Sequence, residues 1–502
     1  MSPWLVLSLI ALYFGVLILI SKFTAKSGGN DEFFLGNRQS PWYVVAFGMI
    51  GTSLSGVTFI SVPGWVANSQ FSYMQMVLGY LLGYAVIALV LMPMYYRLQL
   101  TSIYSYFQDR FGNLSYKTAA ACFLLSRIVG AAFRLYLVAV VLNYAVVERF
   151  WPSNIQLLEE YGIDLRFPLT VIITIVLIFL YTAKGGIKTI IWTDTLQTAF
   201  MLTAVGVTVY LIGSYFGWSL SEIIDQVQAS EYSKVWFFED IKDARFFWKN
   251  FLGGMFITIV MTGMDQDMMQ KNLSCRNIGE AQKNMFGLSF TLVIVNLMFL
   301  SLGVLLYKYA AETGMTLPEK ADELYPMIAL DGGLGIVVGI LFILGLIAAA
   351  YSSADSALAA LTTSVCVDFI DIQHKPEQDQ IKIRKRVHLS LSAVLVGVIL
   401  IFKSLDNSSI ISDLFKAAGY TYGPLLGMFA FGMMTKRKIK DQYIIPIAIV
   451  APLLTYAFAV YAPQLITGYQ TGFELILING LIMFAGLWSI SNNNHGHEAL
   501  DI

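Results

Sequence analysis

Residues Ala348 to Ser356, with the sequence AAAYSSADS, place hydroxyl and carboxylate groups in the middle of a long apolar run. The run extends from Leu334 to Phe369, and as an α-helix it would be on the order of 50 Å long, against roughly 30 Å for a bilayer's hydrocarbon core. Polar groups at that depth are costly unless they bind something, and oxygen ligands suit a hard cation such as sodium. On a helix, Asp355 borders a face of small and hydroxyl side chains, which carries Ala349, Ser352, Ser353 and Ser356.

A purely structural explanation of these serines also exists. Serine hydroxyls in a membrane helix can bond to carbonyl groups of their own helix or pack against a neighbouring helix. This explanation suits a single buried serine better than the cluster, because Asp355 also needs a partner. We therefore expect this face to bind a cation.

The composition indicates a helical protein that crosses a membrane many times. Of the 502 residues, 57% are hydrophobic and 13% are charged, and a soluble chain of this size cannot bury so much apolar surface. A net charge of −1 gives no reason to expect a nucleic-acid partner. The three cysteines and four histidines fit no metal or disulfide pattern. No Walker motif indicates that ATP drives the protein, and no catalytic pair of His, Cys or Glu lies at membrane depth.

The apolar stretches predict about 13 transmembrane helices. Basic residues, Lys271 among them, gather in alternate connections, which the positive-inside rule places in the cytoplasm. The N-terminus is then outside and the C-terminus inside a bacterial-type inner (plasma) membrane. We expect the polar tail after Trp488 to lack regular structure. The predicted spans are residues 3–21, 42–67, 73–96, 117–148, 167–182, 190–213, 248–270, 284–307, 333–369, 387–403, 409–434, 442–461 and 471–490.

Two of these spans carry helix-breaking residues near mid-membrane. The second span contains Gly51, Gly56 and Pro63 among hydroxyl residues, and the seventh contains Gly253 and Gly263. An interrupted helix is tolerated in a membrane where it lines a cavity, and its free carbonyl groups can bind a cation. Close helix packing through small residues is the alternative. Because the two spans are five apart, they predict an inverted repeat of two five-helix halves.

Three basic side chains lie within or near the predicted spans. Arg127 and Arg134 are seven residues apart in the fourth span and share a helix face. Lys416 lies near the outer end of the eleventh span, where snorkelling to the interface would explain it. For the arginines two explanations remain open: one of them binds a substrate carboxylate, or they form ion pairs with buried aspartates. The aspartates available are Asp194, Asp265 and Asp355.

The segment YTAKGGIKTIIWTDTLQ, residues Tyr181 to Gln197, resembles the signature T-x-x-G-G-(x)4-x-W-T-D-x-x-Q of the sodium/solute symporter family. That family includes bacterial proline, galactose and sialic-acid carriers and human sodium/glucose transporters. Further stretches resemble its first, sixth, eighth and tenth core helices, in order: TSLSGVTFISVPGW, GMDQDMMQKNLS, YSSADSALAALTTSVCVDF and YGPLLGMFAFGMMTKR. The resemblance covers nearly the whole chain. It implies an all-α polytopic membrane protein with a five-plus-five inverted-repeat transporter core, whose first and sixth core helices are broken.

The same resemblance implies a division of the chain. We expect an extra helix and cytoplasmic loop first, then two five-helix repeats, the first with an external loop, then two C-terminal helices and a cytoplasmic tail. The corresponding residues are 1–41, 42–247, 248–434, 435–490 and 491–502.

Sodium sites also follow from the resemblance. The family's main site uses carbonyl oxygens of the broken first core helix and of the eighth, with two adjacent hydroxyls. The aspartate of the WTD motif resembles part of the sodium exit route, and in sialic-acid carriers a second sodium lies between it and serines of the eighth helix. Here Asp355 stands where one of those serines is expected. The residues implied are Gly51, Leu54, Ala349, Ser352 and Ser353 for the main site, and Asp194, Asp355 and Ser356 for the second site or exit route.

We therefore predict a sodium-coupled secondary symporter that imports a small organic solute by alternating access and catalyses no covalent reaction. The third span, Tyr73 to Tyr96, has no acidic residue, whereas sugar carriers of the family place a glutamate there. An anionic or zwitterionic solute is favoured: a sialic acid or related acidic sugar first, an amino acid such as proline second, and a neutral sugar or polyol third. A passive channel or a transporter-like sensor is the alternative of another class.

The expected partners are sodium, the solute and the lipid bilayer, and we expect the monomer to be functional. Asp265 and Gln266 are expected to act in gating. The expected substrate contacts are Ser53, Ser55, Thr58, Gln75, Arg127, Arg134 and Lys416.

Overall fold

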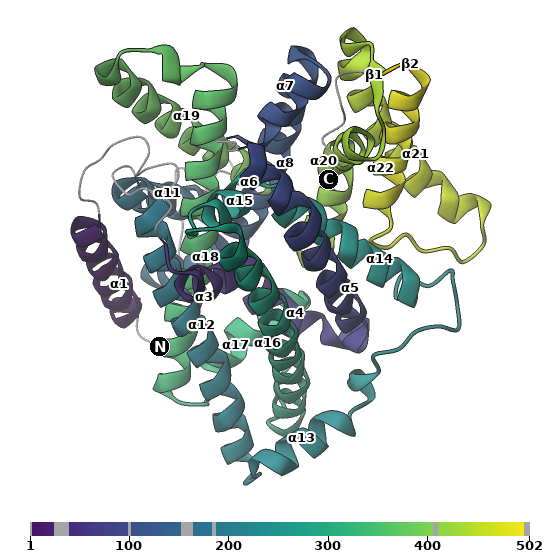
Figure 1. Cartoon of the computed structure of the whole chain (residues 1–502). Helices are drawn as coiled ribbons and strands as arrows, with labels where there is room; N and C mark the ends of the chain where they lie inside the picture. Colours follow the sequence, from purple (N-terminus) through teal and green to yellow (C-terminus); the bar gives the residue numbers. More distant parts are fainter. Residues whose placement is uncertain are drawn as a thin grey trace.

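A computed structural model describes residues 3–24, 40–98, 102–151, 164–182, 187–404 and 410–495. This part of the chain is almost entirely helical (Figure 1). Each predicted span coincides with one helix or with successive helices, which confirms the all-α class. Residues 183–186, which carry the two glycines of the signature, lie outside the described residues.

The first half of the chain supplies the broken helix and the long helices that surround it. Its helices are α1 (Pro3–Thr24), α3 (Trp42–Ser53), α4 (Gly56–Ser69), α5 (Tyr73–Val86), α6 (Met92–Leu98), α7 (Tyr106–Arg110), α8 (Asn113–Leu142), α9 (Glu148–Phe150), α11 (Arg166–Thr182), α12 (Ile187–Tyr215) and α13 (Leu220–Gln228).

The second half has the same character and ends in a small two-stranded sheet. Its elements are α14 (Phe247–Thr258), α15 (Gln266–Leu273), α16 (Ile278–Glu312), α17 (Leu324–Asp331), α18 (Ile336–Ser364), α19 (Glu377–Lys403), α20 (Ile410–Met434), β1 (Arg437–Ile439), α21 (Ile444–Leu465), α22 (Leu475–Ser489) and β2 (Ser491–His495).

Among the described residues, seven helical stretches are long and apolar enough to cross a membrane. The second and third predicted spans merge in part, because α4 to α6 follow one another with only a bend at Gln70, where φ is +53°. The seven stretches are Gly56–Leu98, Asn113–Phe150, Ile190–Tyr215, Ile278–Glu312, Ile336–Phe369, Gln378–Lys403 and Asp441–Leu465, and shorter apolar helices are Trp4–Ile20, Trp42–Ser53, Arg166–Leu180 and Leu475–Ser489.

Both predicted helix breaks are present. Helix α3 ends before Leu54, and α4 begins after Ser55, whose φ of −1° and ψ of 170° are far from helical. In the second half, α14 continues as a π-helical turn that ends at Gly263, and α15 begins after Asp265. The Asp265 carboxylate caps α15 by accepting from two backbone N–H groups of its first turn. The breaks leave polar backbone ends inside the helical bundle.

Small residues bring α5 and α14 into backbone contact. A Cβ atom added at Gly79 would lie 2.1 Å from the carbonyl oxygen of Phe251, and one added at Gly254 would lie 2.1 Å from that of Met76. No side chain fits in these places. Close packing through small residues, the alternative that we considered for the glycines of the seventh span, therefore applies to Gly254. The same span also contains the helix break after Gly263.

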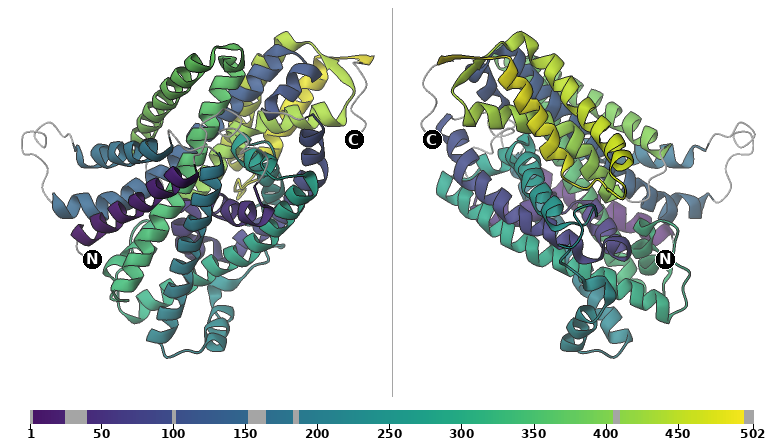
Figure 2. Two further views of the ribbon diagram at one scale, coloured as in Figure 1. Left: turned by 60° about the vertical axis from the view of Figure 1, so that its left-hand side comes forward. Right: turned by 90° about the vertical axis from the view of Figure 1, so that its right-hand side faces the viewer.

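The expectation of an unstructured tail after Trp488 is wrong for its first residues. Strand β2 pairs antiparallel with β1, with Ile439 opposite Ser491. Polar side chains suffice there, because the pairing uses backbone groups. The strands continue the packed helices α20, α21 and α22, which lie side by side along one side of the molecule (Figure 2).

Helices α3, α12, α15 and α18 meet in the middle of the molecule (Figure 1). Two of them come from each half of the chain. At one level of their contact, charged and hydroxyl side chains are buried together. That level holds the candidate site.

Candidate functional site

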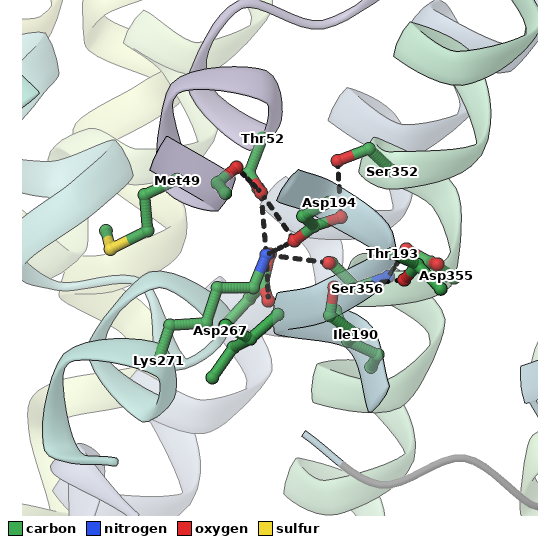
Figure 3. Close-up of polar contacts among 12 residues, drawn as sticks. Met49, Thr52, Ile190, Thr193, Asp194, Asp267, Lys271, Ser352, Asp355 and Ser356 are labelled. Atoms are coloured by element: carbon green, nitrogen blue, oxygen red, sulfur yellow. Dashed lines mark hydrogen bonds and ion pairs between the residues drawn. The ribbon is translucent and has the colours of Figure 1, made fainter. Parts of the chain in front are cut away.

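The ammonium group of Lys271 lies at the centre of a cage of oxygen atoms (Figure 3). Its Nζ donates to Thr52 Oγ1 at 2.7 Å, Asp194 Oδ2 at 2.8 Å and Ser356 Oγ at 2.8 Å. Asp267 Oδ1 lies 3.7 Å away. We call these four oxygen atoms the Lys271 cage. All five side chains are at most 2% exposed, so the charges are held together without water screening.

Asp194 joins three helices through its carboxylate. Its Oδ2 accepts from Lys271 and, at 3.0 Å, from Thr52 Oγ1, while its Oδ1 accepts from Ser352 Oγ at 2.6 Å. Helix α12 places Asp194 where α3 and α18 cross it. Of the two serines that the resemblance placed near Asp194, Ser352 contacts it directly and Ser356 is linked to it through Lys271.

For Arg127, the structure decides between the two explanations left open: it is paired with buried aspartates. It forms an ion pair with Asp267 and lies 3.6 Å from Asp265 Oδ2, which also accepts from Tyr422 Oη at 2.9 Å. Because Asp267 contacts Arg127 with one oxygen and approaches Lys271 with the other, the two cationic groups belong to one buried network. Asp265 was among the partners that we considered, whereas Asp267 was not.

A cavity lies beside this network, next to the break between α3 and α4. Its volume is about 80 Å³, and Leu54 lines it together with five of the predicted substrate contacts. Arg134 is 7% exposed, and its Nε has no hydrogen-bond partner. The five predicted contacts are Ser53, Ser55, Thr58, Arg127 and Arg134.

Two predicted substrate contacts lie elsewhere. The Gln75 amide donates to the Arg245 carbonyl at 2.8 Å and accepts from the Phe237 N–H at 3.2 Å, so it ties α5 to the segment before α14. Lys416 is exposed on α20, as the snorkelling explanation requires. Neither residue lines the cavity.

The predicted main sodium ligands lie on two neighbouring elements. Gly51 and Leu54 are at the end of α3, where the last carbonyl groups lack helical partners. Ala349, Ser352 and Ser353 lie in α18, which packs against α3. Ser353 Oγ is buried with no hydrogen-bond partner, whereas Ser352 Oγ is bound to Asp194.

The remaining predicted residues have local partners. Asp355 accepts from the Ser356 N–H at 2.6 Å. Gln266 Oε1 accepts from the Ile103 N–H at 3.0 Å, which fixes the start of α15 to the segment before α7. Asp265 and Gln266 thus lie at the break between α14 and α15, and their role in gating stays a prediction.

Sequence reasoning missed Lys271. It was counted among the basic residues of the cytoplasmic connections, and this is wrong, because its side chain is 1% exposed and lies in the protein interior. The available signal was its position four residues after Asp267, which puts both side chains on one face of α15. That face points toward Asp194.

Apolar helices long enough to cross a membrane, packed around two helix breaks, are the architecture of a membrane carrier. A model of the Sodium:solute symporter family matches residues 33–441. The chain therefore belongs to the sodium:solute symporter family. Its members are transporters, which confirms a sodium-coupled, multi-pass membrane symporter rather than an enzyme, with sodium as the coupling ion.

Several curated relatives show what this chain is similar to. The Sodium/sialic acid symporter NanT of Aliivibrio fischeri is 25% identical over 446 residues, which cover 85% of this chain and 82% of that protein. The human Sodium/iodide cotransporter is 25% identical, over 80% of this chain and 61% of its own length. The bovine Sodium-coupled monocarboxylate transporter 2 is 24% identical, over 82% and 64%.

Solved structures confirm the architecture. A Na+-coupled sialic acid symporter in a substrate-bound outward-open state superposes with a TM-score of 0.75 at 21% identity, covering 96% of each chain. Mhp1, a nucleobase-cation-symport-1 family transporter, superposes with a TM-score of 0.55 at 16% identity, covering 91% of this chain and 94% of its own. Both have the inverted-repeat transporter fold that the sequence predicted.

Proposed function

We propose that this symporter carries an organic anion whose carboxylate binds Arg134, and that the first candidate is a sialic acid or a related acidic sugar. The observation that carries the proposal is a buried guanidinium that lines the cavity and is not used elsewhere. Among the described residues Arg134 forms no ion pair, in contrast to Arg127 seven residues earlier. A buried cation without a partner is expensive, and a carboxylate neutralises and orients it.

The other cavity residues suit a hydroxylated solute. Ser55 and Thr58 stand at the start of α4, where the helix break exposes backbone N–H groups as well as hydroxyls. Asn296 Oδ1, on α16, is buried and has no hydrogen-bond partner. These groups supply donors and an acceptor around the Arg134 position, which is the pattern of a small polar ligand site.

Sodium binds, in this proposal, between the end of α3 and α18. The proposed ligands are the carbonyl oxygens of Gly51 and Leu54, at a helix end where carbonyl groups lack helical partners, and the free hydroxyl of Ser353. Oxygen atoms of this kind suit a hard cation. Leu54 also lines the cavity, so the same chain break contacts both ligands. Sodium and solute then tighten each other's binding by an equal factor.

A small monocarboxylate is the second candidate. The cavity of about 80 Å³ has room for only a few waters. A nine-carbon sugar acid therefore enters only after α4, α14 and α20 move apart, whereas a short carboxylate requires less movement. Among the relatives, a sodium/sialic acid symporter and a sodium-coupled monocarboxylate transporter represent the two choices.

The test is uptake by purified protein in proteoliposomes with an imposed inward sodium gradient. The labelled solutes are a sialic acid, a short monocarboxylate, proline and glucose, and each acid is also offered unlabelled as its amide or methyl ester. We expect the gradient to drive uptake of one of the acids, and only the free acid to compete. Uptake of glucose alone, or equal competition by acid and ester, would contradict an anionic substrate.

A further inference from the structure

We propose that the Lys271 ammonium is a tethered cation that fills a second cation site, so that one sodium ion instead of two accompanies the solute. This second site is the Lys271 cage and is separate from the sodium position at Ser353. Only the number of sodium ions carried per solute depends on the proposed symport. This one cationic group donates to three buried side-chain oxygen atoms from three different helices.

The cage has the chemistry of a cation site. A lysine ammonium has three N–H donors, and here each finds one oxygen: two hydroxyls and one carboxylate, at 2.7 to 2.8 Å. These distances are those of charge-assisted hydrogen bonds. The oxygens come from α3, α12 and α18, and the oxygen of Asp267 completes a fourth side. Oxygen atoms that converge from separate helices are what a hard monovalent ion requires.

The Lys271 ammonium and a sodium ion cannot share this cage. Both carry one positive charge, both need the same oxygens, and the low-dielectric interior magnifies their repulsion. Both oxygens of Asp194 already accept hydrogen bonds, Oδ2 from Lys271 and Thr52 and Oδ1 from Ser352. The ammonium is bonded to the chain and never leaves with the solute, so the cage carries no charge across the membrane.

An ordinary structural ion pair is the competing explanation. It would need Asp194 alone and would not require the hydroxyls of Thr52 and Ser356 to point at Nζ (Figure 3). It also makes a different prediction. If Lys271 only stabilises the fold, its removal leaves a damaged protein without a new ion site. If it fills a cation site, its removal vacates that site for sodium.

The experiment counts sodium ions bound to purified protein in lipid nanodiscs, with radioactive sodium at saturating concentration. We expect one ion per wild-type protein and one per Lys271→Arg variant, which keeps the cation. Lys271→Ala vacates the cage and should bind two. Lys308→Ala is the matched control, because Lys308 bonds to Gln226 outside the network, and it should bind one.

The proposal predicts that Lys271→Ala binds one sodium ion more than the wild type. No gain in folded Lys271→Ala, or two ions in the wild type, would overturn it. If Lys271→Ala does not fold, Lys271→Ser replaces it. The number of sodium ions bound to the wild type and the wild type's Hill coefficient for sodium are both expected to be near one, and they then test the proposal. If the proposed main site at Ser353 does not bind sodium but the cage proposal holds, the wild type should bind no sodium ion and Lys271→Ala should bind one. That result would refute only the proposed main site.

Discussion

Arg127 and Arg134 differ in whether an aspartate pairs with them, and this difference separates a structural role from the proposed substrate contact. Arg127 is held by Asp265 and Asp267, while Arg134 lines the cavity with an unpaired Nε. The sequence shows that both share a helix face at membrane depth, and this much was predicted. It does not show which of them is paired, because the partners lie about 140 residues away and beyond a helix break.

Arg134→Gln should lower uptake of the preferred acid by roughly ten- to hundredfold, the value of a charge-assisted hydrogen bond. Uptake of any solute without a carboxylate should change little. Competition by acid and by methyl ester in proteoliposomes measures both effects, and Arg134→Lys is the control, since it keeps the charge but loses the bidentate geometry. An unchanged preference for the acid in Arg134→Gln would refute the role of this residue.

Arg127→Gln should act on stability instead. It leaves Asp265 and Asp267 without their cation, and breaking a buried ion pair from one side costs about 3–5 kcal/mol. Thermal unfolding in detergent should show a large downward shift of the melting temperature, and adding Asp267→Asn should recover part of it. An Arg127→Gln protein as stable as the wild type would show that the pair contributes nothing.

At the scale of elements, the helix breaks were predictable and their exact contacts were not. Gly56 and Pro63 in one span, and Gly263 before Asp265 in another, indicate that neither helix runs straight. The polar run that forms β2 gave no such signal, since its SNNNH sequence has no alternation of apolar residues. Likewise Lys271 resembles an ordinary interfacial lysine until α15 is placed against α12.

Gly254→Ala should destabilise the protein by about 1–3 kcal/mol, because the new methyl group would press on the carbonyl of Met76 across the α5–α14 contact. Gly206→Ala in α12 is the matched control. No atom lies within 4 Å of its added Cβ, so the change should be neutral or stabilise by up to about 1 kcal/mol. Melting curves of the two variants test this, and equal shifts would contradict the close contact of α5 and α14.

At the scale of the whole molecule, the cage and the main sodium position both join the two halves of the chain. Helices α3 and α12 come from the first half and α15 and α18 from the second. Movement of one half against the other therefore changes the ligands of every cation at the centre. The inverted repeat was predictable from two breaks five spans apart, whereas the network that locks the halves needed the three-dimensional arrangement.

The orientation in the membrane remains a prediction at this scale. Removing Lys271 from the count of cytoplasmic basic residues leaves the clusters at 375–386 and 436–440, so the C-terminus is still expected inside. A cysteine added at the C-terminus should react with an impermeant maleimide only after the cells are permeabilised. Labelling of intact cells would place the C-terminus outside and reverse the direction of the proposed import.

In the proposed symport, sodium bound between the end of α3 and the serines of α18 drives uptake, with the free hydroxyl of Ser353 as a ligand. The most direct measurement is accumulation of the preferred solute in proteoliposomes with an imposed sodium gradient, for the wild type and for Ser352→Ala combined with Ser353→Ala. The wild type should accumulate solute with sodium and not with potassium, and the double variant, shown by its melting curve to be folded, should lose this dependence. Accumulation that stays equally sodium-dependent in the folded double variant would contradict the account.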